Sequence, residues 1–191
     1  SVYGRNWDGY GDATATPDHI AALFSGRWAN GGKYSWEYVH VFSWSGDLVA
    51  VLRLDRDVRG IALDRAHGRL FSACANGNFV VSDVQKETVV TMLPIGARAD
   101  GAGFDASKGL AFTSNGEGTL TVVRADSSDK FSVVGNISTA VGARTLAFDP
   151  GSRRIFTITA TLGEAPAPTQ EQPRPRRPIV PGSFRLLVLA D

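Results

Sequence analysis

The chain has 191 residues, of which 43% are hydrophobic and 20% are charged, as in ordinary soluble globular proteins. Twenty basic and nineteen acidic residues leave a net charge of +1, so the overall charge gives no attraction to nucleic acid or to an anionic membrane. The single cysteine, Cys74, excludes an intramolecular disulfide, and no apolar run reaches the roughly 18 residues of a membrane span. We therefore expect a soluble protein with no membrane partner, in a compartment that composition leaves open.

The first sixty residues predict four short strands. They are expected over 11–17, 19–25, 38–44 and 48–55, where runs of apolar and β-branched residues are bounded by turn residues. All four tryptophans of the chain lie in its first 44 residues. This part of the chain thus has the strand pattern of the rest but a different composition.

A repeat of about 40 residues follows, close to the length of one β-propeller blade. Its copies are marked by Asp64, Asp105 and Asp149, which stand 41 and 44 residues apart. Each aspartate ends one apolar strand and precedes a polar turn and a second apolar strand. Aspartate opens such turns because its carboxylate accepts N–H bonds from the residues just beyond it. We predict that role for all three, in place of metal binding or catalysis.

Third and fourth strands complete each copy of the repeat. Third strands are expected over 79–83 and 120–124, and fourth strands over 88–95 and 130–137. The asparagine and glycine residues at 76–78 and 115–118 suit tight hairpin turns, because both residue types tolerate positive φ. No apolar period of 3.6 is sustained anywhere, so the sequence predicts an all-β fold.

The last copy is interrupted by a proline-rich loop. Its second strand is expected over 155–161 and its third over 183–190, and no fourth strand follows. The loop between them, 163–182, holds most of the prolines of the chain. Proline at this density blocks helices and strand ladders, so we expect an extended surface loop. The three arginines of the loop, Arg174, Arg176 and Arg177, could attract phosphate groups or simply be solvated.

Residues 57–191 resemble the C-terminal blades of YVTN-repeat, YncE-like seven-bladed propellers. The resemblance is carried by Gly60-Ile-Ala-Leu-Asp-Arg-Ala-His-Gly-Arg-Leu-Phe-Ser72, by residues 109–123 and by Phe184-Arg-Leu-Leu-Val-Leu189. It implies a bacterial periplasmic or secreted protein, and it leaves nucleic-acid binding as one alternative function.

Residues 1–56 resemble instead one blade of a TolB-like six-bladed propeller, through residues 18–27 and 39–47. The shift in tryptophan content fits a join between two propeller lineages near 55–61. A natural fusion and a recombinant or designed chimera both account for such a join.

We predict a single β-propeller domain over 1–191, with four-stranded antiparallel blades at about 8–56, 57–96, 97–140 and 141–191. The families it resembles form closed rings of six or seven blades, whereas this chain has about four. Residues 1–7 are a candidate strand to complete the last blade. A four-bladed monomer and an incomplete fragment are alternatives, but we favour two chains that form one eight-bladed ring, because closed symmetric dimers are the commonest assembly.

No catalytic motif is present: there is no Gly-x-Ser-x-Gly, His-Glu-x-x-His, phosphate-binding glycine loop or cysteine pair for zinc. We therefore expect a non-enzymatic scaffold or binding module, with no cofactor and no metal site. The alternative is a lactonase-like, metal-dependent hydrolase, for which Asp100, Asn115 and Glu117 supply suitable side chains.

Propellers bind ligands where their loops converge on the axis. The candidate residues there are Arg98, Asp100, Asn115 and Arg144. Arg98 and Arg144 precede innermost strands of successive blades, and two guanidinium groups at one channel mouth suit a small anionic ligand. The alternative is that each arginine pairs with a neighbouring aspartate or carbonyl group.

Overall fold

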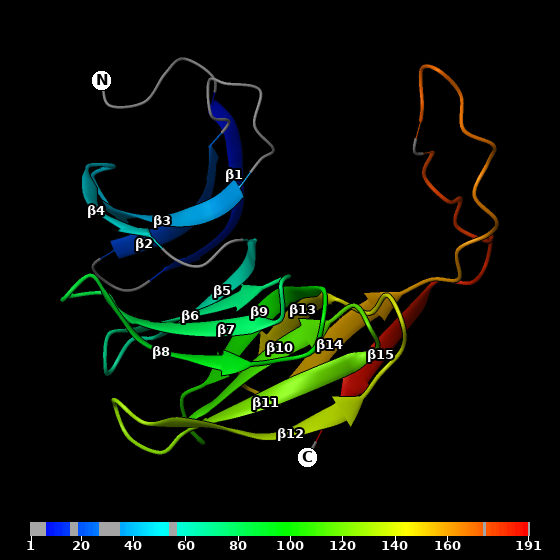
Figure 1. The fold of residues 1–191 in the computed structure, drawn as a ribbon. Coiled ribbons are helices and arrows are strands. Elements are labelled where there is room, and N and C mark those ends of the chain that lie inside the picture. The colour runs from blue at the N-terminus through cyan, green and yellow to red at the C-terminus, as the bar shows by residue number, and fades with distance from the viewer. Residues whose placement is uncertain (1–6, 16–18, 27–34, 54–56, 174, 191) are drawn as a thin grey trace.

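The computed structural model describes residues 7–15, 19–26, 35–53, 57–173 and 175–190. Over these residues the molecule consists of four antiparallel β-sheets and contains no helix, which confirms the all-β prediction (Figure 1). None of the described segments is a helix that could cross a membrane.

The strands follow the order of the chain within every sheet. The first sheet contains β1 (Trp7–Ala15), β2 (His19–Gly26), β3 (Ser35–Ser43) and β4 (Leu48–Arg53). The second contains β5 (Val58–Asp64), β6 (Arg69–Cys74), β7 (Asn78–Asp83) and β8 (Thr88–Pro94). The third contains β9 (Ala99–Asp105), β10 (Leu110–Asn115), β11 (Thr119–Ala125) and β12 (Phe131–Ser138). The fourth has three strands, β13 (Thr145–Asp149), β14 (Arg154–Thr159) and β15 (Arg185–Leu189).

The first strands of successive sheets lie side by side. β1 contacts β5, β5 contacts β9, and β9 contacts β13, while β8 and β12 lie at the outer rim (Figure 1). Each sheet therefore has an inner strand, which touches the next sheet's inner strand, and outer strands that spread away from it. The candidate closing strand 1–7 falls outside the described residues except for Trp7, which begins β1.

The three repeated aspartates open turns, as predicted. Asp64 Oδ1 accepts a bond from the backbone N–H of Ala66 at 3.0 Å, and Asp105 Oδ1 accepts one from Ser107 at 2.8 Å. Asp149 Oδ1 accepts the N–H of Gly151 at 3.0 Å. Each carboxylate thus caps the turn that leads from an inner strand to the second strand of its sheet.

The strand register shows which side chains are equivalent in the three repeats. One row crosses the first three strands of each sheet two residues before the aspartate, with a phenylalanine on the middle strand: Ala62–Phe71–Val81, Gly103–Phe112–Val122 and Ala147–Phe156–Val188. A second row lies two residues nearer the start of the inner strand: Gly60–Ala73–Phe79, Gly101–Ser114–Leu120 and Thr145–Ile158–Leu186.

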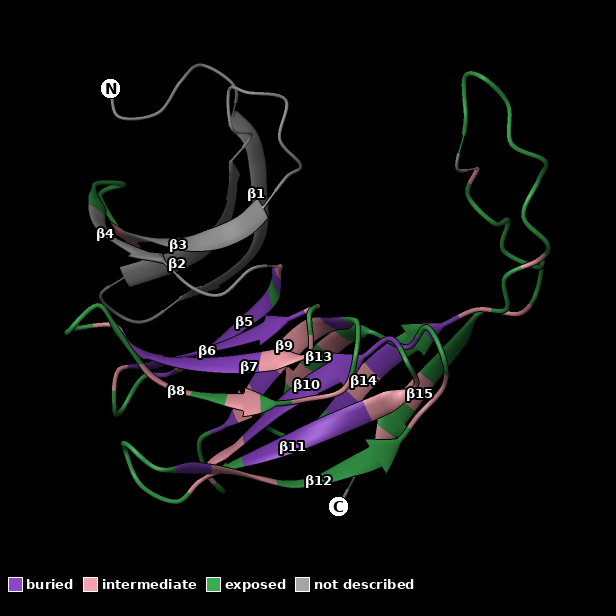
Figure 2. Cartoon of the chain, in the orientation of Figure 1, coloured by how far each residue is buried: buried purple, intermediate pink, exposed green. Residues whose placement is uncertain are grey.

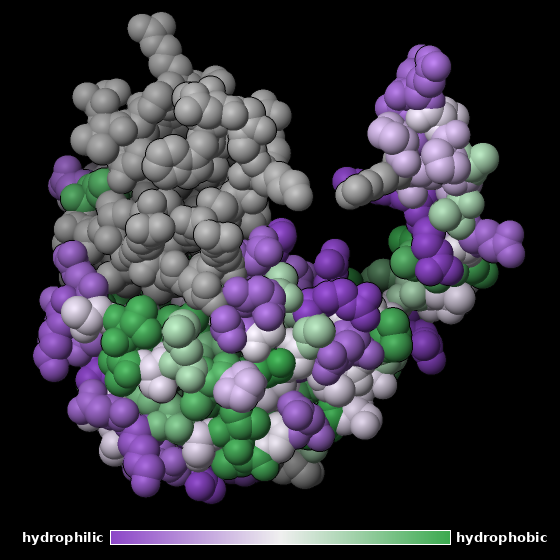
Figure 3. Space-filling view, in the orientation of Figure 1, coloured by the Kyte–Doolittle hydropathy of each residue, from purple (hydrophilic) through white to green (hydrophobic). Residues whose placement is uncertain are grey.

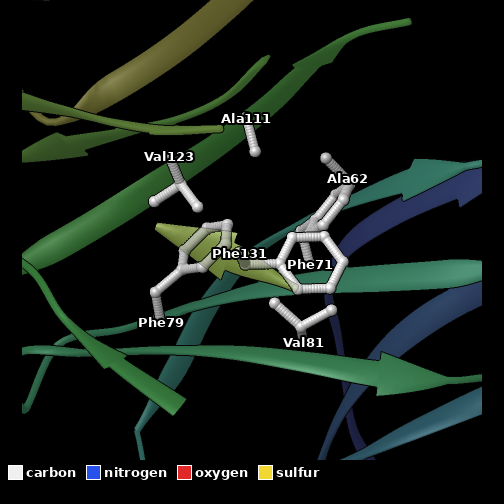
Figure 4. Close-up of a cluster of buried hydrophobic side chains, with 7 residues drawn as sticks. All are labelled: Ala62, Phe71, Phe79, Val81, Ala111, Val123 and Phe131. Carbon is white, nitrogen blue, oxygen red and sulfur yellow. The ribbon is translucent and has the colours of Figure 1, made fainter. Parts of the chain in front are cut away.

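These rows form the core between sheets. Phe71 and Phe79 of the second sheet are fully buried and pack with Ala111, Val123 and Phe131 of the third (Figure 4). At the next junction Phe112, Leu120 and Val122 pack with Ile155 of the fourth sheet. Figure 2 shows the result as buried residues on the middle strands β6, β7, β10 and β11, with exposed residues on β12 and β15.

Glycine permits the inner strands to approach one another. A Cβ atom on Gly60 would lie 2.6 Å from the carbonyl oxygen of Asp100 in β9. A Cβ atom on Gly101 would lie 2.5 Å from the Cβ atom of Leu146 in β13. Real Cβ contacts are longer than this, so only glycine fits at either position.

A buried arginine joins the second sheet to the third. The side chain of Arg69 is 9% exposed; its Nη1 atom lies 3.0 Å from Asp83 Oδ2 in its own sheet. In the β11–β12 turn, it donates to the carbonyl of Ser128 at 2.7 Å, and its Nη2 atom lies 2.8 Å from Asp129 Oδ1. Charges removed from water need such complete pairing. Arg69 therefore connects the β11–β12 turn of the third sheet to strands β6 and β7 of the second.

We expect Gly101→Val to destabilise the fold by about 1–3 kcal/mol, because overpacking pushes β9 away from β13. Urea denaturation followed by circular dichroism measures the free energy of unfolding. Gly135→Ala is the control: a Cβ atom there meets nothing within 4 Å, so its change should stay within about 0.5 kcal/mol. Equal losses in the two variants would contradict the close approach.

We expect Arg69→Met to cost up to about 3–5 kcal/mol, because Asp83 loses its buried partner and keeps only the exposed Lys86, 3.6 Å away. The hydrogen bond from Arg69 is the main cause that lowers the pKa of Asp129. For Asp83, the backbone N–H of Lys86 is the largest cause of the lowered pKa, and the charge of Arg69 contributes. Urea denaturation at neutral pH measures the loss.

A lowered carboxyl pKa stabilises the fold above the ordinary value of about 3.9, and that contribution is lost as pH falls through the lowered pKa. Asp129→Asn should therefore be less stable than the parent chain at pH 7. The difference should shrink below about pH 4, which urea titrations between pH 2.5 and about 7 would measure. A difference that is independent of pH would rule out the ion pair as its cause.

Candidate functional site

The inner strands line an open groove at the centre of the molecule. It has a volume of about 870 Å³, and its walls are formed by β5, β9 and β13 together with the turns that follow β5 and β9. Arg59 and Asp100 lie near the start of these strands, and Arg65 and Pro150 lie beyond their ends. The groove therefore follows the inner strands along their whole length.

Three charged residues occupy equivalent positions on the inner strands. Arg59, Asp100 and Arg144 each stand immediately before the residue that pairs with Ala73, Ser114 or Ile158. Arg144 Nε lies 3.7 Å from Asp100 Oδ2, and Arg59 Nη2 lies 3.2 Å from Asp57 Oδ1. Arg59 and Asp100 line this end of the groove, whereas Arg144, just before β13, lines a smaller cavity next to it.

Arg98 is not equivalent to Arg144. It stands two residues earlier, at the position of Asp57 and Gly142, and all three residues have a left-handed backbone with φ of 61°, 59° and 85° in chain order. Backbone bonds hold this conformation: the N–H of Arg98 donates to Ala75 at 3.2 Å, and its carbonyl accepts from Gly116 at 3.0 Å. The sequence predicted that Arg98 and Arg144 hold matching places before successive inner strands. The register shows instead that Asp100, not Arg98, is the equivalent of Arg144.

Arg98 and Arg144 nevertheless meet beside Gly116. A Cβ atom on Gly116 would lie 3.2 Å from Arg98 Cβ and 3.6 Å from Arg144 Cδ, and Arg98 Nη2 donates to the Gly116 carbonyl at 2.9 Å. Both arginines line a cavity of about 430 Å³ with apolar residues of the fourth sheet and its loop. The structure therefore brings together two of the four candidate residues around one cavity.

Asn115 donates hydrogen bonds that stabilise the β10–β11 hairpin. Its side chain is fully buried, and its Nδ2 atom donates to Thr119 at 2.9 Å and to Thr121 at 2.8 Å. Glu117 accepts from the backbone N–H of Ala97 at 3.0 Å and from the hydroxyl of Thr119 at 3.1 Å. These bonds tie the β10–β11 turn to the loop before β9.

The three side chains of the hydrolase alternative are engaged in two different places. Asp100 pairs with Arg144, whereas Asn115 and Glu117 take part in the bonds of the β10–β11 turn. Within the described residues, no group of three histidine, cysteine, aspartate or glutamate side chains is placed to hold a metal ion. Cys74 is buried.

The proline-rich loop forms an arm, residues 161–183, that projects away from the sheets (Figures 1 and 3). Leu162 and Ile179 pair at its base, and Arg177 donates to the carbonyl of Gly163 at 2.7 Å. Arg176 is exposed, and Arg174 lies outside the described residues.

Two features of these sites were not predicted from the sequence: Arg59, and the apolar lining that the arm gives to the smaller cavity. Counting five residues back from each repeated aspartate would have found Arg59, since the same step reaches Asp100 and Arg144. No pattern in the sequence predicts the apolar lining, because Leu162 and Ile179 are far apart in the chain and meet only through the bridge at the base of the arm.

No protein-family model and no curated protein matches the chain. Among solved structures it is similar to Kuenenia stuttgartiensis hydrazine synthase, with a TM-score of 0.69 and 14% identity over 86% of this chain and 46% of that one. It is also similar to a functionally unknown protein from Desulfotomaculum acetoxidans DSM 771, with a TM-score of 0.64 and 11% identity, covering 83% and 51% of the two chains. At these identities the likeness concerns the fold alone. The chain spans about half the length of each protein.

We expect Asn115→Ala to destabilise the chain by about 1–3 kcal/mol, because the hydroxyls of Thr119 and Thr121 lose a buried partner. Thermal and urea unfolding would measure the loss, with Asn76→Ala in an exposed turn as the control. If Asn115 were a metal ligand instead, added divalent cations would stabilise the parent chain, and Asn115→Ala would abolish that stabilisation.

Proposed function

We propose that the chain is a non-enzymatic scaffold that assembles with a second copy of itself to complete a β-propeller ring. The observation that supports this is the apolar face of the fourth sheet. It carries the same row that is buried at the two preceding junctions, but here Leu186 is 59% exposed and Val188 is 51% exposed. Their equivalents Phe79 and Val81 are fully buried.

This face differs from the other exposed apolar residues. Val89 and Met92 of β8, and Val134 and Ile137 of β12, are exposed on outer strands, where Figure 3 shows hydrophobic residues among charged ones. β8 and β12 are the outermost strands of their sheets, so their exposure is ordinary for this fold. The face of the fourth sheet, in contrast, repeats a surface that the chain itself covers twice with another sheet.

The occupant that fits this face is a further sheet of the same kind, and the first sheet of a second copy supplies one. Strands β1, β2 and β3 of the first sheet contact β5 of the same chain, and we propose that this sheet also covers the fourth sheet of the second copy. Two such contacts, related by a two-fold axis, close a ring of eight sheets.

Light scattering of the purified chain should give a mass of twice 20.4 kDa at micromolar concentration. We expect Leu186→Glu combined with Val188→Glu to give a folded monomer, because two buried carboxylates oppose the contact. Val134→Glu, on the exposed rim strand β12, is the matched control and should leave the dimer intact.

A parent chain that remains a monomer at about 100 µM would overturn the proposal in favour of a single-chain ring or of contacts with another protein. A dimer that survives both glutamates, with an unchanged circular dichroism spectrum, would place the contact on another surface.

A further inference from the structure

We propose that the cavity between Arg98, Arg144 and the base of the arm binds an organic anion with an apolar body, such as a medium-chain carboxylate. Two arginines line it together with four apolar side chains, Ile158, Leu162, Ile179 and Phe184, whose exposures lie between 36% and 61%. A volume of about 430 Å³ lies within the ordinary range for small-molecule sites, roughly 300–1,000 Å³.

The fourth sheet differs from the others at this place. Beside the inner strand, the second sheet has Gly60 paired with Ala73, and the third has Gly101 paired with Ser114. There the next inner strand lies in contact, so no space remains: the Ser114 hydroxyl donates to the carbonyl of Arg144. The fourth sheet has Thr145 paired with Ile158 instead.

These larger side chains keep any following sheet away from the inner end of this junction. The cavity is present in the single chain, and the inference rests on that chain and not on the proposed ring.

The arginines are placed to hold an anion. The backbone bonds of Arg98 fix its position, and one of its five N–H groups is used by Gly116. Arg144 is 59% exposed, and its 3.7 Å contact with Asp100 is longer than a charge-assisted hydrogen bond of about 2.7–2.9 Å. A carboxylate that approaches from the cavity can therefore accept bonds from both guanidinium groups, while its chain lies on Phe184 and Ile179.

Isothermal titration calorimetry with octanoate, 1-octanol and acetate separates the two parts of the site. Octanoate should bind at least tenfold more tightly than octanol, which lacks the charge, and than acetate, which lacks the chain. Arg98→Gln and Arg144→Gln should each weaken octanoate binding about tenfold and leave octanol binding unchanged. Arg124→Gln, which removes an exposed arginine of β11 outside the cavity, is the matched control.

Phe184→Ala should weaken octanoate and octanol alike. Light scattering of the arginine variants should give the parent mass, so that failure of this site is distinguished from failure of the ring. Should a variant not fold, the salt dependence of the parent chain decides: octanoate affinity should fall with ionic strength and octanol affinity should not. Equal affinities for octanoate and octanol, or unchanged octanoate binding in both folded arginine variants, would overturn the proposal.

Discussion

The close approach of neighbouring inner strands is the constraint on which this fold depends. β5 lies against β9, and β9 against β13, at positions where Gly60 and Gly101 leave no room for a Cβ atom. Once the backbones meet there, the sheets spread outward, and large side chains such as Phe71, Phe79 and Phe112 fill the space between them. Small residues at the centre and large ones farther out thus produce the radial arrangement of sheets.

The same constraint explains why the fourth sheet is different. Thr145 and Ile158 replace the small residues of the earlier sheets, so a following sheet cannot approach its inner end as closely. Its outer half keeps the apolar row of the repeat, with Leu186 and Val188 exposed. One part of this face is therefore suited to contact with another sheet, and the other part to a cavity. The assembly that we propose covers Leu186 and Val188, and the anion site lies beside Ile158, the neighbour of Leu186 on β14.

Several residues that resemble functional groups have structural roles. The buried Asn115 side chain donates hydrogen bonds within its own hairpin, and the repeated aspartates cap turns. Arg69, which has no role in the groove, joins two sheets through Asp83 and Asp129. Buried polar groups in this chain therefore connect strands and turns, whereas Arg98 and Arg144 lie at a cavity with donors that face solvent.

Local sequence was enough to predict the all-β class, the strand and turn pattern and the role of Asp64, Asp105 and Asp149, because alternation and turn chemistry act over only a few residues. Four candidate site residues were also readable, but their arrangement was not. Only the tertiary structure showed that Arg59, Asp100 and Arg144 are equivalent and that Arg98 belongs to another row. It also placed Ile179 of the arm beside both arginines of the cavity. Register and contacts between sheets join residues far apart in the chain, so no local pattern encodes them.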